Sequence, residues 1–369
     1  MSPADAEDTM QATGHELWSD VLDRLRELQD EVQRAEEFIA RRMEEGARVE
    51  ARGARGEEAA RGGGRGAREN PDPEALDPRP SGPVPSPELA PHLLAEIRAD
   101  LASDPIRALD FAYPPGLFAP GAPPEWSQRE CLRRHSHHTA RLAMFVAERH
   151  GYQPSTVEVI GLCALLHDVG LETVPPDLFS KSVPLMPRER ALLEAHAIEG
   201  AERLAASSGL EGLMRAIVPR VVRQHHERSD GSGYPDGLDE PHIHEFARLL
   251  AIVEAYETMI SPRPYRQACL PHEAMEALLV DAFGKAGRPA RLDKRMATSF
   301  LRALSLYPIG SGVELASGEK GQVVGSNPDA PDRPHVRLLW AADGQRLERP
   351  RVVDLRRAGI EVARAVPLP

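Results

Sequence analysis

The sequence predicts a mostly helical protein with a small β extension at its C-terminal end. Between residues 88 and 308, apolar residues recur at intervals of three and four, the period of helices that bury one face. From residue 309 to residue 369, short runs rich in Val and Leu are separated by Gly, Asn and Pro, a pattern typical of four or five strands joined by turns. Residues 46–87 are rich in Gly, Arg, Glu and Pro and cannot build a core.

The first 45 residues are expected to hold one amphipathic helix. Apolar residues step by three and four along residues 17–45, which gives a heptad seam over roughly three heptads. Two interpretations stand side by side: a short coiled coil that joins two copies into a homodimer, and a helix packed on its own chain. The linker that follows, residues 46–87, is expected to be disordered and semi-extended in its Pro-rich half.

Composition narrows the class of partner and compartment. The chain has 369 residues and a formal net charge of −12, so a nucleic-acid polymer is a poor partner, although an anionic small ligand is compatible with a metal site. The three cysteines, Cys131, Cys163 and Cys269, stand far apart and predict reduced thiols in a cytoplasmic protein. No apolar run approaches the roughly 20 residues of a membrane span, so no membrane association is expected.

Several predicted helices carry an imidazole or a carboxylate among apolar neighbours. His138 shares a helical face with apolar residues, and His196 lies on a later helix. The pair His167-Asp168 closes an apolar helix just before Gly170. A buried Asp168 without a partner would be costly, and a position bridging two metal ions would remove that cost.

Two adjacent histidines and a second carboxylate complete the set. Neighbouring residues on a helix point about 100° apart, so His225 and His226 can reach one cluster only near a helix end. The Gly-rich turn directly after them, residues 227–235, supplies such an end. Glu254 lies within a strongly apolar helix, where a metal ligand is a better interpretation than an unpaired charge. These residue types are the material of a two-metal site.

Residues from about 138 to 307 resemble the HD-GYP domains, a subgroup of the HD phosphohydrolase superfamily. An HD pair alone is a weak signal, but an HD pair, a double His and an intact Gly-Tyr-Pro in this order are specific. The matching pieces are His138-Thr-Ala-Arg141, Leu165-Leu-His167-Asp168-Val-Gly170, Lys181, His196 with Gly200, His225-His226-Glu227-Arg228-Ser-Asp230-Gly231-Ser-Gly233-Tyr234-Pro235, and Arg263-Pro-Tyr265-Arg266.

The resemblance implies an all-α HD-domain bundle of about seven helices, here residues 88–308, that hydrolyses cyclic di-GMP to GMP or linear pGpG. It implies two divalent metal ions, iron or manganese, and a His-rich ligand set suits both metals. The residues implied are listed by role: one metal at His138, His167, Asp168 and Glu254; the second at His196, His225 and His226, bridged by Asp168; catalysis by His167, Asp168 and Glu254; substrate contacts from Arg263, Arg266 and Tyr234; and the GYP motif Gly233-Tyr234-Pro235.

The sequence departs from the family pattern at four positions. Leu171 stands where the family has a phosphate-contacting Lys, and Glu254 and Glu257 stand where it has Asp. Arg134 stands one turn before His138, where members with a third metal carry Glu. Two alternatives therefore stay open: a degenerate module that binds metal, nucleotide or signalling proteins without turnover, and an HD hydrolase of another phosphodiester.

Overall fold

The computed structural model describes residues 86–87, 90–103, 109, 128–175, 178, 181, 185–261, 268–284 and 289–367. All of them belong to one compact unit, Gly82–Pro369. The predictions for residues 1–45, for nearly all of the linker 46–87, and for Arg263 and Arg266 lie outside the described residues.

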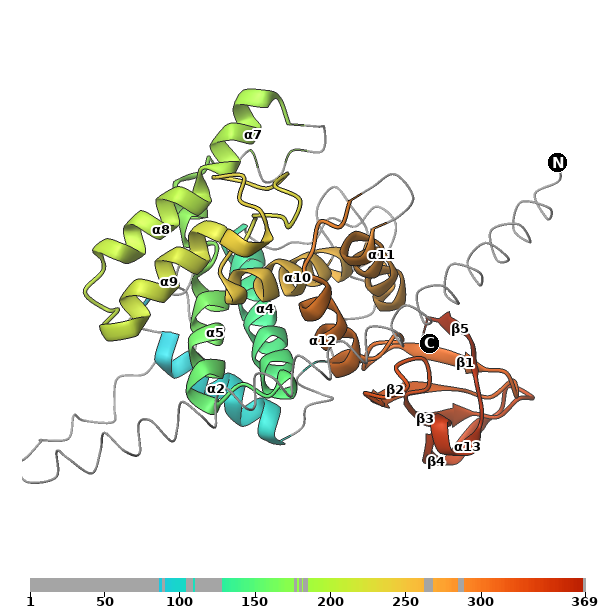
Figure 1. The fold of residues 1–369 in the computed structure, drawn as a ribbon. Helices are drawn as coiled ribbons and strands as arrows, with labels where there is room; N and C mark the ends of the chain where they lie inside the picture. Colours follow the sequence, from blue (N-terminus) through green and yellow to red (C-terminus); the bar gives the residue numbers. More distant parts are fainter. Residues whose placement is uncertain are drawn as a thin grey trace, which may run out of the picture. The chain divides into compact units, whose positions relative to one another are not determined.

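The part of the chain that the structure describes is mostly helical up to residue 304, as expected (Figure 1). Nine α-helices precede the sheet in these ranges: α2 (Ala90–Ser103), α4 (Gln128–His150), α5 (Pro154–Leu166), α7 (Pro187–Glu194), α8 (His196–Ala206), α9 (Gly212–Gln224), α10 (Glu245–Ile260), α11 (Pro271–Phe283) and α12 (Lys294–Leu304). Short 3-10 helices η2 (Val169–Thr173) and η3 (Glu240–His242) lie between them.

Helix α5 forms the centre of the helical part. Its residues from Ile160 to Leu166 are all buried, because α2, α4 and α9 pack around it. The helix ends at Leu166, and η2 begins at Val169, so His167 and Asp168 lie in the break between them. This places the HD pair in the interior.

The same segment corrects one expectation about membranes. Pro154–Thr173 is long and apolar enough, by length and composition, to cross a membrane, and 67% of its most apolar window is buried inside the structure. A buried core helix of a soluble protein passes the same test, so this is weak evidence for a span.

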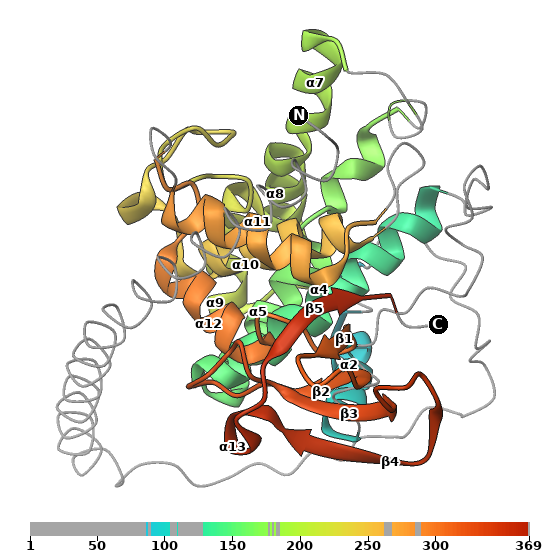
Figure 2. The same cartoon turned by 90° about the vertical axis from the view of Figure 1, so that its right-hand side faces the viewer.

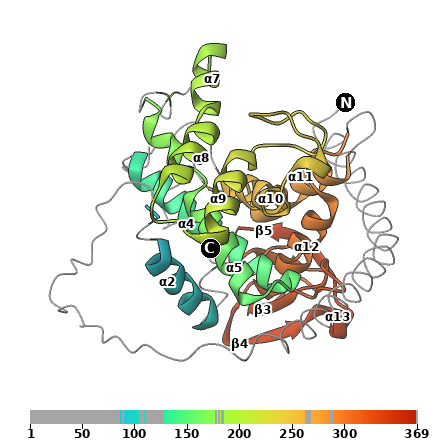
Figure 3. The same ribbon diagram turned by 60° about the vertical axis from the view of Figure 1, so that its left-hand side comes forward.

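The region predicted as one helix around His196 is two helices. Helix α7 begins with Pro187 in its first turn, as predicted, but ends at Glu194. Ala195 separates it from α8, which starts at His196. Helix α8 packs against η2 and against α9, beside which it lies in Figure 3. His196, the first residue of α8, is buried.

The C-terminal extension is one antiparallel sheet with the strand order β4-β3-β2-β1-β5, which Figure 2 shows from one edge to the other. The strands are β1 (Gly312–Leu315), β2 (Lys320–Gly325), β3 (His335–Trp340), β4 (Arg346–Asp354) and β5 (Val362–Val366). A short helix, α13 (Leu355–Ala358), follows β4. Its core consists of Val313, Leu315, Val323, Val336, Leu338 and Leu355.

Short polar contacts join the last helices to the sheet. The Leu306 amide and the Ser305 hydroxyl donate to the Pro331 carbonyl at 2.9 and 2.6 Å. His272 of α11 stacks on Tyr307 with ring centroids 4.6 Å apart. These contacts tie the segment after α12 to the connection between β2 and β3, and tie α11 to the same segment through Tyr307.

His272 makes this junction sensitive to pH. Burial alone would lower the pKa of His272, but Glu276 and the Leu306 carbonyl, whose atoms lie 3.1 Å from the two ring nitrogens, raise it overall. A histidine with a raised pKa stabilises the fold at pH values below its unfolded pKa of about 6.5. This stabilisation is lost as the pH rises through the folded pKa. We expect Glu276→Gln to lower the melting temperature at pH 5.5 and to lower it less at pH 9, measured by circular dichroism. A difference that is constant or grows with pH would contradict this.

Candidate metal centre

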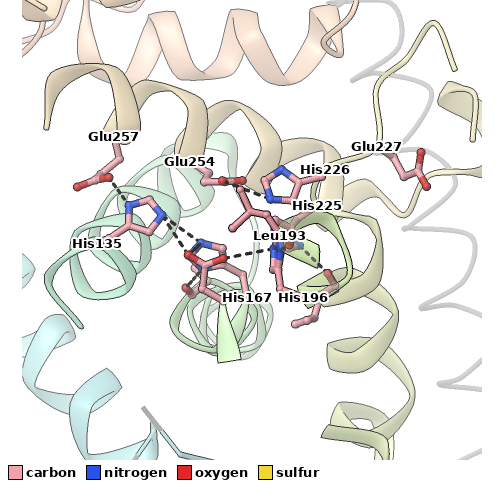
Figure 4. A network of polar contacts seen from close by, with 12 residues as sticks. His135, His167, Leu193, His196, His225, His226, Glu227, Glu254 and Glu257 are labelled. Atoms are coloured by element: carbon pink, nitrogen blue, oxygen red, sulfur yellow. Dashed lines mark hydrogen bonds and ion pairs between the residues drawn. The ribbon is translucent and has the colours of Figure 1, made fainter. Parts of the chain in front are cut away.

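Five helices deliver their polar side chains to one buried region (Figure 4). Helix α4 contributes a side chain from its middle, and α10 contributes one from its third turn. The break after α5, the start of α8 and the end of α9 supply the rest. Among the described residues, two groups of donor atoms each lie within 4.8 Å of one another: Asp168, His196, His225 and His226; and His135, His167 and Glu254.

His135, and not His138, is the α4 histidine in this site. The His135 Nε2 atom lies 3.2 Å from Nε2 of His167 and 3.6 Å from the Asp168 carboxylate. His138 lies one turn later, with its Nδ1 atom 3.4 Å from Glu257. Residues three apart share a helical face, so the apolar pattern could not separate the two. The assignment of His138 as a ligand is therefore corrected to His135.

Four of the five imidazoles of the site are oriented by a hydrogen bond at Nδ1. His167, His196 and His225 each direct Nδ1 at the carbonyl three residues earlier, at 2.8, 2.6 and 2.5 Å. His135 directs its Nδ1 at the buried Glu257 carboxylate. Because a carbonyl oxygen can only accept, the proton is on Nδ1 in the three rings with carbonyl partners. Their Nε2 atoms therefore carry the lone pairs that bind metals.

These Nε2 atoms face one another across short distances. His135 and His167 are 3.2 Å apart at Nε2, and His196 and His225 are 3.3 Å apart. Lone pairs at such distances repel unless a cation lies between them. The Asp168 carboxylate lies 3.2 Å from His167 and 3.5 Å from His196, so it touches both groups. The donor set thus fits two cations with Asp168 between them.

The pKa shifts of these side chains also favour the binding of metal ions. Burial lowers the pKa of His225 and of His226 well below the ordinary value, which keeps both rings neutral. Burial alone would raise the pKa of Asp168, but the surrounding imidazoles, His167 first among them, hold it well below its ordinary range. Burial alone would lower the pKa of His167, but the Asp168 carboxylate raises it to about 9, so a metal ion bound at His167 would replace a proton.

Glu254 is the second carboxylate of the site. Burial raises the pKa of Glu254, since a charge there loses its hydration. Its Oε1 atom is 3.8 Å from His226, and its buried Oε2 atom has no hydrogen-bond partner in the structure. A buried carboxylate oxygen without a donor is costly, and a metal ion would satisfy it.

Hydrogen bonds and ring stacking hold the turn after α9 in place. Glu227 is buried and accepts hydrogen bonds from the amides of Asp236 and Leu238 at 2.7 and 2.9 Å. Arg223 donates twice to Asp236, at 2.7 Å each. Tyr234 stacks on His226 with ring centroids 4.6 Å apart. The turn therefore fixes one wall of the site against a ligand imidazole.

Gly233 is needed for close backbone packing in this turn. A Cβ atom at Gly233 would lie 2.4 Å from both the Arg228 amide nitrogen and the Glu227 Cα. We expect Gly233→Ala to destabilise the protein by about 1–3 kcal/mol, the usual effect of overpacking. Thermal unfolding would measure this, with Ser232→Ala in the same turn as the control. Equal melting temperatures for the two variants would contradict it.

Other predicted residues have mixed outcomes. Leu171 is buried, with 6% of its surface exposed. Arg134 directly precedes His135, so it does not lie one turn before the α4 histidine of the site. Sequence reasoning also missed that Glu257 orients His135 and that Glu227 ties the turn. Their signal was a carboxylate within a strongly apolar segment for Glu257, and one directly after the double His for Glu227.

The comparison with protein families agrees with this geometry. Residues 124–282 match the family model of the HD domain. Residues 312–359, which contain most of the sheet, match a KOW domain associated with the HD domain. Both donor groups lie within the range that matches the HD domain, residues 124–282.

Known relatives of this chain confirm its resemblance to HD-GYP proteins. The chain is 32% identical to the cyclic di-GMP phosphodiesterase PA4108 of Pseudomonas aeruginosa, over 55% of this chain and 46% of the relative. It is 33% identical to the cyclic di-GMP phosphodiesterase response regulator RpfG of Xanthomonas campestris, over 46% and 42%. A solved structure, Bd1817, a HDG"Y"P protein from Bdellovibrio bacteriovorus, is similar with TM-score 0.38 and 19% identity over 61% of this chain and 73% of that one, and a likeness at this level supports no assignment for this chain. The chain spans less than half of each sequence relative.

Proposed function

We propose that this protein hydrolyses cyclic di-GMP, to GMP or to linear pGpG, with two divalent metal ions of which iron or manganese are the best candidates. The observation that carries the proposal is the arrangement around Asp168. Five imidazoles and two carboxylates converge there, and the Nδ1 atoms of four of the five rings are already engaged elsewhere. The names of the relatives support the choice of substrate.

The chain's own residues would do four things in this reaction. His135, His167 and Glu254 would hold one ion, and His196, His225 and His226 the other, with Asp168 between them. Divalent ions bound there supply an activated water and stabilise negative charge developing on a phosphate. The backbone carbonyls and Glu257 orient the rings, so little reorganisation is needed when a ligand binds. Tyr234, stacked on His226, would face the substrate, with Arg263 and Arg266 proposed as phosphate contacts.

A second candidate rests on Leu171. This position carries a buried apolar side chain and can offer no cation to a phosphate. If turnover depends on a cation there, the protein is a module that binds metal and nucleotide, or protein partners, without hydrolysis.

One experiment separates the two candidates. Purified protein would be stripped of metal, reloaded with iron or manganese, and incubated with cyclic di-GMP, with products resolved by chromatography. Turnover that follows the metal content supports hydrolysis. Binding of cyclic di-GMP without turnover under every metal condition supports the second candidate. Turnover of other phosphodiesters but not of cyclic di-GMP would move the proposal to another substrate.

Residues 17–45 are proposed to pair two copies of the chain. The heptad seam supports this. Deleting the segment and measuring the mass of the particle in solution tests it, and an unchanged number of subunits would overturn it.

A cytoplasmic location is also proposed. Cys163 and Cys269 are free thiols, which fits a reducing compartment. Recovery of the protein in membrane or periplasmic fractions would contradict this.

A further inference from the structure

A cavity of about 280 Å³ adjoins the metal centre. It is lined by residues from three places: Glu254, Thr258 and Met259 of α10, Leu278 and Asp281 of α11, and Arg228 of the turn after the double histidine. Glu254 belongs both to this lining and to the donor group with His135 and His167. A ligand bound at the metal centre can therefore extend directly into the cavity.

Its size and walls suit one flat ring system. Pockets for small molecules usually span about 300–1,000 Å³, so this cavity fits one nucleobase and not a whole dinucleotide. Met259 and Leu278 supply apolar surface for the faces of a ring. The cavity is therefore shaped for a base, while the phosphates remain at the metal centre.

The charges of the lining exclude a phosphate from the cavity itself. Two carboxylates, Glu254 and Asp281, face one guanidinium, that of Arg228. An anion would be repelled by the pair of carboxylates. A neutral group that offers donors to a carboxylate and acceptors to a guanidinium is the better match.

Arg228 is held in place before any ligand binds. Its Nη1 atom donates to the carbonyls of Glu227 and His225 at 2.9 and 3.3 Å, and these are the hydrogen bonds it makes among the described residues. The rest of the guanidinium stays available as a donor at a fixed position. Among the described residues, the Asp281 carboxylate makes a long contact, 3.4 Å from Oδ2 to Arg291. Both side chains can thus bind a further partner.

We propose that this cavity is the subsite for a guanine base. The edge of guanine presents N2–H, N1–H, O6 and N7 in that order, two donors followed by two acceptors. Asp281 accepts from N2–H and N1–H, and Arg228 donates to O6 and N7, the pairing that arginine makes with guanine elsewhere. Adenine places an acceptor, N1, where the carboxylate needs a donor. This inference rests on the proposed function, because it assumes that the phosphate of a nucleotide binds at the metal centre.

The test compares the binding of GMP, IMP and AMP to the metal-loaded full chain by calorimetry. The wild type should prefer GMP to AMP by about 5- to 150-fold, the discrimination of one bidentate pair. IMP, which lacks the 2-amino group, should bind more weakly than GMP. Asp281→Asn should lose the preference for GMP and gain affinity for AMP, since an amide can pair with N1 and N6 of adenine. Glu273→Gln, the same charge change on the same helix outside the cavity, should keep the wild-type order.

The outcomes separate this inference from the proposed function. Equal binding of the three nucleotides by the wild type, or an unchanged preference in Asp281→Asn, would overturn the guanine subsite even if cyclic di-GMP is hydrolysed. A preference for GMP that Asp281→Asn abolishes would uphold the subsite even if no turnover occurs. The comparison of GMP with IMP needs no variant, so a folding defect in Asp281→Asn leaves the test intact.

Discussion

Asp168→Asn is expected to lower the turnover of cyclic di-GMP by roughly 10²- to 10⁴-fold, the range given by the several kcal/mol that metal ions contribute to such reactions. The side chain keeps its shape but loses its charge. The carboxylate lies within 3.2–3.6 Å of His167, His196 and His135, so both donor groups lose their shared anion. Metal content by elemental analysis should fall together with turnover.

Asp343→Asn is the matched control for this variant. Asp343 lies in the turn between β3 and β4, is exposed, and accepts a hydrogen bond from the Gln345 amide. It should retain both metal and turnover. An Asp168→Asn protein with the metal content and turnover of the wild type would exclude Asp168 as the bridge.

The second large effect is expected at Glu257, a positioning residue that touches no substrate. Its carboxylate is buried, bonds to His135 Nδ1, and accepts from the Ser261 hydroxyl at 2.5 Å. Glu257→Gln should weaken metal binding about 10- to 100-fold, as loss of a partner behind a ligand does. It should also destabilise the fold by about 1.5–3 kcal/mol, the contribution of hydrogen bonds to a charged group. Metal titration and thermal unfolding measure the two effects.

Ser261→Ala separates positioning from stability. It removes one hydrogen bond from the same carboxylate but leaves the contact between Glu257 and His135. We expect lower stability with metal affinity close to that of the wild type. If Glu257→Gln binds metal as tightly as Ser261→Ala does, Glu257 has only a structural role.

The helical part of the fold could be predicted because apolar periodicity reports which face of a helix is buried. Apolar periodicity could not show that Ala195 divides α7 from α8, since apolar residues continue across that break. One Val-rich run of the predicted β extension closes β4 at Asp354, but the next residue, Leu355, begins α13 and lies in the core of the sheet. The residue at which a helix or strand ends depends on contacts with residues distant in sequence.

The candidate site shows the same limit at finer scale. His167, Asp168, His196, His225 and His226 were predicted and lie together in the structure. His135 was confused with His138 because spacing defines a face and not the atom that reaches a neighbour. The link from Glu257 to His135 joins residues 122 positions apart, and no local pattern encodes it.

The hydrogen bonds that orient the four histidines differ in how easily a substitution can remove them. His167, His196 and His225 depend on main-chain carbonyls, which every amino acid possesses, so no single substitution at the partner residue can delete those acceptors. His135 depends on the side chain of Glu257, which one nucleotide change can remove. During divergence, the orientation of a site histidine is therefore more easily changed at position 257 than at the three residues that offer main-chain carbonyls.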